Sequence, residues 1–404
     1  MAEVGLGRVL REWTRIGLLG FGGPPAHVLM MRERFVRDLG WIDAHEFQDA
    51  LATTNLLPGP ASTQLAIFCG WRVAGARGAL VGGLGFIVPG LLLVIAASVL
   101  LLGSDPPTVV LGLAGGVAAG VPAVAVHAGS GLVPASWARA AGRAARMRWL
   151  LWVLLGSVAA AFFGTAVVAV ILVCGGLELV FRAPGPQAGG HASGTRAIGP
   201  GGLPSFLVAK TAAGVAGVAG VGALAALAWT AVKVGALSFG GGFVIVPLMQ
   251  ADTLRHHWLT RTGFGTAVAL GQVTPGPVTH TVAAVGYAAG GRGWAGVGAA
   301  LLAAAIAFAP SFVFVIAGAR HHDRLRRDDR ARAFLDGAGP AAIGAIFGAA
   351  VALAMAISRP WQVAALVLVA VAVFWVRRST PIALALAGAL GAVAVTWLAL
   401  PLPR

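Results

Sequence analysis

Charged residues are scarce in this chain of 404 residues, at 11% of the sequence, whereas 58% of the residues are hydrophobic and the mean hydropathy is +0.86. A soluble domain carries about 25% charged residues, so this composition excludes an ordinary water-soluble protein. Because each bilayer crossing takes roughly 20 apolar residues, the length allows about 10–12 membrane segments. Backbone groups in lipid must be hydrogen-bonded internally, so we expect an all-α polytopic membrane protein.

Catalytic and metal-binding patterns are also missing from the sequence. It contains no HExxH, GxSxG, Walker A or CxxC motif, which argues against a membrane protease, a hydrolase and an ATP-driven pump. Both cysteines, Cys69 and Cys174, lie in apolar runs and are expected to be packing residues. We therefore predict that the protein is not an enzyme and uses no cofactor or metal ion.

Acidic residues number only 14, against 29 lysines and arginines, which gives a formal net charge of +15. No basic stripe alternates with aromatic residues, so nucleic acid is not an expected partner. Two interpretations stay open for the few acidic residues and the histidines near the motifs described below: they carry a coupling proton, or they are solvated loop residues. These residues are Glu33, Asp38, Asp43, Glu46, Asp49, Asp252, His27 and His280.

What the sequence does contain is a duplication, because two rare motifs, FGG and PGP, each occur twice in the same order. The aligned segments are WTRIGLLGFGGP (13–24) with AVKVGALSFGGG (231–242), and WIDAHEFQDALATTNLLPGPAS (41–62) with WLTRTGFGTAVALGQVTPGPVT (258–279). Further along, Pro89 matches Pro310. We predict two repeats, 1–181 and 205–404, joined by a Gly/Pro-rich linker at 182–204.

The charges of the loops predict how the two repeats are oriented. The stretch 137–148 carries four arginines and 320–332 carries six, whereas 103–107 carries none and 358–360 carries one. Short basic loops stay in the cytoplasm, so equivalent helices of the two repeats are expected to run in opposite directions. The fold class that we predict is therefore a pair of inverted-topology repeats with broken or re-entrant helices.

The FGG motifs are expected to break their helices. A glycine inside a helix costs about 1 kcal/mol relative to alanine, and Pro24 removes a backbone donor beside the first motif. A broken helix at membrane depth persists only inside protein or beside a water-filled cavity. Tight helix crossing is the alternative explanation for a single glycine pair, but repetition in both halves favours a binding site.

The PGP motifs are expected to precede helix starts, because proline suits the first helical turn. The segments that follow them, 61–64 and 278–281, would then present free N–H groups and the positive end of a helix dipole to an anion. An ordinary turn at the membrane edge with capping hydroxyls is the alternative.

Arg15 and Lys233 precede the two FGG motifs at equivalent positions. Cations inside membrane helices are costly and usually mark a transport pathway, so we expect the pair to balance a dianion. For Arg15 the alternative is that its side chain extends to the lipid headgroups.

These motifs resemble the chromate ion transporter family. FGGP, Trp41 and LLPGPASTQLAI resemble its N-terminal domain, and KVGALSFGGG, Trp258 and LGQVTPGP resemble its C-terminal domain. The resemblance covers 13–98 and 229–317 and implies a long-chain, two-domain member with inverted domains. The candidate substrate-binding residues are Arg15, Phe21, Gly22, Gly23, Pro24, His27, Asn55, Pro58, Gly59, Pro60, Ser62, Gln64, Lys233, Ser238, Phe239, Gly240, Gly241, Gly242, Gln272, Pro275, Gly276, Pro277 and Thr279.

The resemblance implies a multi-pass protein of the plasma membrane that expels chromate, a tetrahedral oxyanion, by secondary active transport. The membrane potential or proton antiport would drive export, and a transporter or channel for sulfate or another small anion is the alternative. Two departures bear on the choice of oxyanion, since Gly20 stands where the family usually has serine and Asn55 where it usually has glutamine. The expected partners are the oxyanion and the lipid bilayer, and a homodimer is compatible with the sequence.

Overall fold

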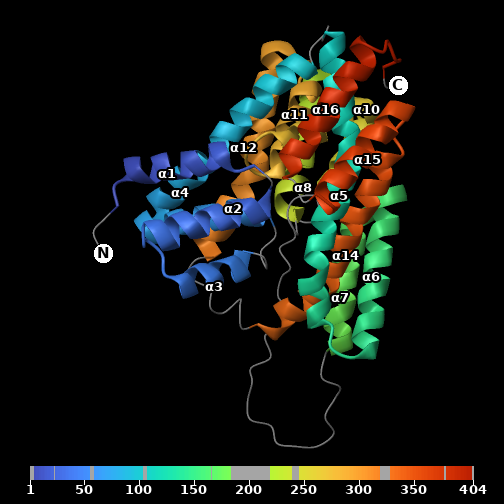
Figure 1. Ribbon diagram of the computed structural model, residues 1–404. Helices are drawn as coiled ribbons and strands as arrows, with labels where there is room; N and C mark the ends of the chain where they lie inside the picture. The colour runs from blue at the N-terminus through green and yellow to red at the C-terminus, as the bar shows by residue number, and fades with distance from the viewer. Residues whose placement is uncertain are drawn as a thin grey trace, which may run out of the picture.

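The computed structural model is built from helices (Figure 1). It describes residues 4–21, 23–54, 59–102, 107–164, 166–182, 219–238, 245–318, 328–376 and 379–402. The first repeat contains α1 (Leu6–Leu19), α2 (Pro24–Met31), the π-helix η1 (Arg32–Asp38), α3 (Ala44–Thr54), α4 (Ala61–Leu101), α5 (Thr108–Arg139), α6 (Arg143–Phe162) and α7 (Ala166–Arg182). The second contains α8 (Ala219–Leu237), α9 (Ile245–Arg255), α10 (Arg261–Val273), the 3₁₀-helix η3 (Val278–His280), α11 (Thr281–Ala289), α12 (Gly293–Gly318), α14 (Asp329–Ala354), α15 (Pro360–Phe374) and α16 (Thr380–Thr396).

Five helices in the described ranges are long and apolar enough to cross a membrane. They lie at Ala61–Leu101, Thr108–Arg139, Arg143–Phe162, Gly293–Gly318 and Arg332–Ala354. Three shorter apolar helices accompany them, at Gly222–Leu237, Pro360–Phe374 and Thr380–Thr396. The prediction of an all-α polytopic membrane protein is confirmed. The predicted linker, apart from Arg182, lies outside the described residues, so the repeat boundaries stay a prediction.

The first FGG motif interrupts its helix as expected. The helix α1 ends at Leu19 and α2 begins at Pro24, while Gly23 between them has a φ of 74°. Only glycine adopts this backbone conformation at no steric cost. In the second repeat α8 ends at Leu237 and α9 begins at Ile245, and the motif itself lies outside the described residues.

After each PGP motif the chain forms a helical hairpin. In the first repeat α4 is interrupted at Ala74 and Gly75, and its first part folds back so that Gly70 packs against Gly78. In the second repeat α11 is followed by a turn and folds back on α12, where Tyr287 contacts Gly296. The short first arm of each hairpin is a broken membrane helix. The helix after the second PGP motif begins as 3₁₀-helix rather than α-helix.

The repeats pack against each other through equivalent helices that run antiparallel. The Arg139 side chain of α5 is paired with Asp336 of α14, while Gly129, earlier in α5, contacts Phe347, later in α14. A two-fold axis perpendicular to these helices therefore relates them, as an inverted repeat requires. Each of these two helices packs against helices of the other repeat. The helix α5 packs against α15 and α16, and α14 packs against α6 and α7. Figure 1 shows α5, α6, α7 and α14 side by side.

The same glycine contact occurs in both repeats. Gly17 of α1 lies against the Phe86 carbonyl of α4, and its equivalent Gly235 of α8 lies against the Ala307 carbonyl of α12. Neither position has room for a Cβ atom. Such close approach of backbones supplies the van der Waals packing that holds helices together in lipid. The repeated contact places α1 and α8, the helices that precede the two FGG motifs, in equivalent surroundings.

Candidate substrate-binding site

The PGP turn of each repeat is hydrogen-bonded to the first helix of the other repeat. The Gly59 N–H donates to the Ser238 carbonyl oxygen over 2.8 Å, and the Gly276 N–H donates to the Gly20 carbonyl oxygen over 3.0 Å. The alignment makes Gly59 equivalent to Gly276 and Gly20 equivalent to Ser238. The two PGP turns thus meet the ends of the first helices of the opposite repeats, at Gly20 and Ser238, directly before the FGG motifs in the sequence.

Both central glycines of the PGP motifs have a left-handed backbone. The φ angle is 126° at Gly59 and 100° at Gly276. At Gly276 a Cβ atom would lie 2.8 Å from the His280 ring, and at Gly59 it would lie 3.2 Å from the Ser311 hydroxyl oxygen. Glycine is therefore required at both turns, and the turns bring His280 and Ser311 to the junction.

The helix α4 begins directly after Pro60, with its first polar side chains buried. Ser62, Thr63 and Gln64 are at most 2% exposed. The Gln64 N–H closes the first helical turn on the Pro60 carbonyl over 3.0 Å, so the N–H groups of the residues before it have no intrahelical acceptor. This end of α4 offers donors and the positive end of a helix dipole.

His27 connects the FGG loop of the first repeat to the start of α4. Its Nε2 lies 2.9 Å from the Gly20 carbonyl oxygen, and its Nδ1 lies 3.2 Å from the Ser62 hydroxyl oxygen. Because a carbonyl oxygen only accepts, Nε2 carries the proton, and Nδ1 then accepts from the hydroxyl of Ser62. The ring edge packs against Phe86, so the imidazole is fixed in the buried junction.

Several buried polar atoms at this junction have no hydrogen-bond partner in the described part of the chain. A buried polar group left unpaired costs about 1–3 kcal/mol, so a concentration of them is expected only where a polar ligand or water binds. The atoms are Thr63 Oγ1, Ser238 Oγ, Gln272 Nε2, Thr279 Oγ1, both ring nitrogens of His280, and Ser311 Oγ. Each of these side chains can donate a hydrogen bond while neutral, and His280 does so from one of its two ring nitrogens.

Thr63 and Ser311 were not among the predicted site residues. Thr63 lies between two predicted residues at the start of α4, where the hydroxyl run was visible. Ser311 follows Pro310, and the repeat alignment pairs it with Gly90, which packs against the Pro275 carbonyl and His280. The small residues Gly90 and Ser311, which contact the PGP turn of the opposite repeat, could therefore have been found from the aligned prolines Pro89 and Pro310.

Not all predicted site residues reach this junction in the described conformation. Arg15 is exposed on α1 and Phe21 is 43% exposed at the end of that helix. Lys233 is half-buried and is paired with Asp252 of α9. Whether these residues bind substrate stays a prediction. Seven of the predicted candidates fall outside the described residues: Gly22, Asn55, Pro58, Phe239, Gly240, Gly241 and Gly242.

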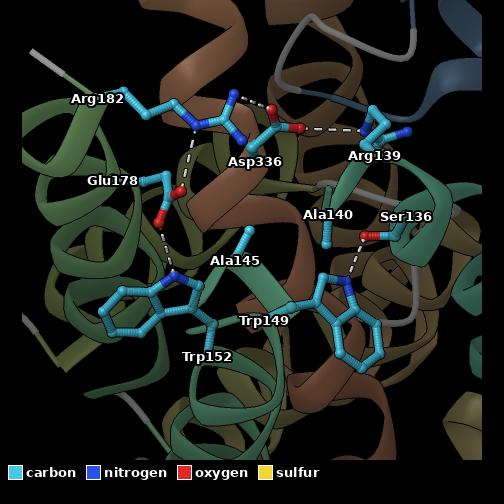
Figure 2. Close-up of a pocket in the computed structure, with 9 residues that line it drawn as sticks. All are labelled: Ser136, Arg139, Ala140, Ala145, Trp149, Trp152, Glu178, Arg182 and Asp336. Atoms are coloured by element: carbon cyan, nitrogen blue, oxygen red, sulfur yellow. Dashed lines mark hydrogen bonds and ion pairs between the residues drawn. The ribbon is translucent and has the colours of Figure 1, made fainter. Parts of the chain in front are cut away.

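A second polar cluster lies at one end of the bundle formed by α5, α6, α7 and α14 (Figure 2). Asp336 is paired with Arg139 of α5 and with Arg182 of α7. Glu178 accepts hydrogen bonds from Arg148 at 2.9 Å and from the Trp152 indole at 3.2 Å. The pocket between these side chains has a volume of about 10 Å³, which is room for one water molecule. The cluster therefore joins helices of both repeats and is too small for an oxyanion.

Comparison with known proteins matches the FGG and PGP regions of both repeats to one family. The model of the family described as "Chromate transporter" matches residues 7–179 and 225–393. The chain belongs to the chromate transporter family. A chromate transport protein of Cupriavidus metallidurans is 30% identical over 96% of this chain and 93% of its own length. One from Pseudomonas aeruginosa is also 30% identical, over 86% of this chain and 80% of its own. A probable chromate transport protein of Synechococcus elongatus is 27% identical over 86% of this chain and 84% of its own.

The family and the apolar helices together make this chain a multi-pass membrane protein, as predicted. The named relatives are transport proteins, in agreement with the absence of catalytic motifs from the sequence. Among solved structures, none matches this fold.

Proposed function

We propose that this chain exports chromate across the plasma membrane and binds it at the junction of the FGG loops and PGP turns. The observation that carries the proposal is the group of buried neutral donors at this junction, which lie beside the N-terminus of α4. Chromate presents four oxygens that only accept hydrogen bonds. Hydroxyl, amide, imidazole and backbone N–H donors fit such a ligand, and the named relatives transport it.

The membrane potential suffices as a driving force for export. Moving one elementary charge across 100 mV is worth about 2.3 kcal/mol, so a dianion that leaves an inside-negative cell gains about 4.6 kcal/mol. The inverted repeats supply a mechanism for alternating access, because rocking one repeat against the other exposes a central site to each side in turn. The two inter-repeat hydrogen bonds, from Gly59 and Gly276, lie at the place where such rocking would act.

Uptake of radiolabelled chromate by everted vesicles or proteoliposomes tests the proposal. Thr63→Val and Ser311→Ala each remove one hydroxyl from the junction. A single hydrogen bond contributes about 0.5–1.5 kcal/mol, so each variant is expected to raise the chromate KM about two- to tenfold. Ser98→Ala is the matched control, because its hydroxyl is equally buried in α4 but donates to the Val94 carbonyl.

Wild-type affinity in both site variants would show that the anion binds elsewhere. Sulfate serves as the competitor, because it shares the tetrahedral shape and the double negative charge. Transport of labelled sulfate that chromate fails to inhibit would favour the alternative of a sulfate transporter.

A further inference from the structure

Asp252 and Lys233 form a buried ion pair that joins α8 to α9. Asp252 is 5% exposed, and its Oδ2 accepts a hydrogen bond from the Thr230 hydroxyl over 2.7 Å and another from the Lys233 ammonium group. Lys233 is the one charged residue of α8, in a helix that is otherwise apolar. Ionisable residues inside an apolar membrane helix are costly and usually functional. The proposed binding site is built from neutral donors, so it does not use the Asp252–Lys233 pair.

The first repeat holds the equivalent helices together with a different ion pair. There Glu12 of α1 is bound by Arg34, with bonds of 2.8 Å from Nε and 3.0 Å from Nη2 to the two carboxylate oxygens. Extending the first aligned segment backwards by one residue places Glu12 at the position of Thr230, and Arg34 and Asp252 both lie between the FGG and PGP motifs of their repeats. Guanidinium stays charged and binds both oxygens at once, whereas ammonium acts as a point charge. A proton on the carboxylate would break either pair, and in the second repeat it competes with one ammonium contact rather than with two guanidinium bonds.

The ion pair lies beside the binding junction. Ser238, whose hydroxyl is among the unpartnered donors, is the residue directly after α8 and follows Lys233 by five positions, which corresponds to about 7.5 Å at the helical rise. While Asp252 is ionised, it cancels the charge of Lys233. When a proton binds Asp252, the carboxylate becomes a neutral acid and the ammonium charge acts on the neighbouring anion.

Arg255 lies about one helical turn after Asp252 on α9, and further charged groups lie on the elements that pack against α9. The α6–α7 turn contacts α9 where Gly164 meets Ala251, and the charged residues of α6 and α7 lie at the opposite ends of those helices. On α9 itself Arg255 is followed by two exposed histidines. The groups are Arg255, His256, His257, Arg261 at the start of α10, His280 before α11, Arg143, Arg146 and Arg148 of α6, Glu178 and Arg182 of α7, and Asp329, Arg330, Arg332 and Asp336 in the first turns of α14.

We propose that Asp252 is a proton-binding site that couples proton movement to anion movement, an inference that rests on the proposed function. The protonation step is balanced: one proton joins the carboxylate, the ammonium keeps its three hydrogens, and one net positive charge is added beside the site. That charge favours the anion, and by linkage the bound anion favours the proton. The two therefore move together, so one net negative charge leaves per chromate, and the membrane potential still drives export with half the force that it exerts on the bare dianion.

The experiment compares wild-type protein with Asp252→Asn in proteoliposomes loaded with a pH-sensitive dye. In the wild type, chromate flux is expected to carry protons in the same direction, and chromate affinity to rise about tenfold as pH falls, the size expected for one charge roughly 10 Å away at an intermediate dielectric constant. In Asp252→Asn, which imitates the protonated acid, chromate flux persists without proton movement and its affinity loses this pH dependence. Both proteins meet the same chromate species at each pH, so titration of chromate cancels in their affinity ratio.

Two further variants make the result decisive. Asp252→Glu keeps a carboxylate and should retain proton movement, and Asp336→Asn alters an ion pair far from α9 and should behave as wild type. If Asp252→Asn does not accumulate, Lys233→Gln combined with Asp252→Asn removes both charges and should likewise abolish proton movement.

Proton movement of wild-type size in the Asp252 variants, or proton movement opposite to chromate in the wild type, would overturn the inference. Absence of chromate flux in the wild type is a different result, since it overturns the proposed function and the inference with it.

Discussion

The Gly59 N–H of the first repeat donates to the Ser238 carbonyl oxygen of the second over 2.8 Å, and its two-fold equivalent joins Gly276 to Gly20. The PGP turn of each repeat is therefore hydrogen-bonded to the residue that follows the first helix of the other repeat. The unpartnered polar atoms at the junction come from both repeats, so the proposed binding site needs both.

Substitution of the central PGP glycines should disable the protein. Gly276→Ala places a methyl group 2.8 Å from the His280 ring in a backbone with φ of 100°, and such strain costs about 1–3 kcal/mol. We expect a lower melting temperature and little chromate transport. Gly298→Ala is the control, because no atom lies within 4 Å of a Cβ there. Equal stability of the two variants would refute the strained geometry of the turn.

Substitutions of Lys233 and Arg15 should have different effects on the protein. Lys233→Ala leaves the Asp252 carboxylate buried without its cation, which typically costs about 3–5 kcal/mol, so we expect loss of protein from the membrane. Lys233→Met combined with Asp252→Leu should restore protein levels, because no buried charge is left.

Arg15→Ala should be mild, since that side chain is exposed. Chromate resistance of cells at matched membrane levels is the measurement. A severe Arg15→Ala defect in resistance at normal protein levels would instead support direct binding of the anion by Arg15.

The charged cluster of Figure 2 should stabilise the bundle rather than bind substrate. Glu178→Gln removes the carboxylate shared by Arg148, Arg182 and Trp152. Loss of one member of a buried ion pair costs about 3–5 kcal/mol, so the melting temperature of the purified protein should fall by several degrees. Asp38→Asn alters an exposed pair with Arg34 and should change it little. A changed chromate KM at unchanged stability would contradict this role.

The two ends of the bundle should face opposite sides of the membrane. The Arg139–Asp336 contact places the end of α5 and the start of α14 together, and contact of Gly112 with Gly391 places the start of α5 near the end of α16. A cysteine at Ala141 should be shielded from an impermeant reagent added outside, and one at Ser358 should react. Both native cysteines are buried, so background labelling is low. Labelling of Ala141→Cys from outside would reverse the predicted orientation.

The sequence by itself determined that the protein lies in lipid, that it contains a duplication, and where its helices are interrupted. Low charge requires lipid, consecutive glycines beside Pro24 cannot continue a helix, and Pro60 can begin one. These are local effects, and α1, α2 and α4 end and begin where those residues predict. The interruption of α4 at Ala74 and Gly75 falls between two apolar runs of the sequence, 47–70 and 79–102.

The tertiary structure alone decided which helices meet. Membrane helices are apolar on most faces, so hydrophobic periodicity does not identify a partner, and contacts depend on where small residues let two backbones approach. The pairing of α14 with α6 and α7 follows from such approach, and so does the packing of the second PGP turn against Gly90 of α4. A cation was predictable at position 233, but only the packing of α9 against α8 in the tertiary structure showed that Asp252 is its partner.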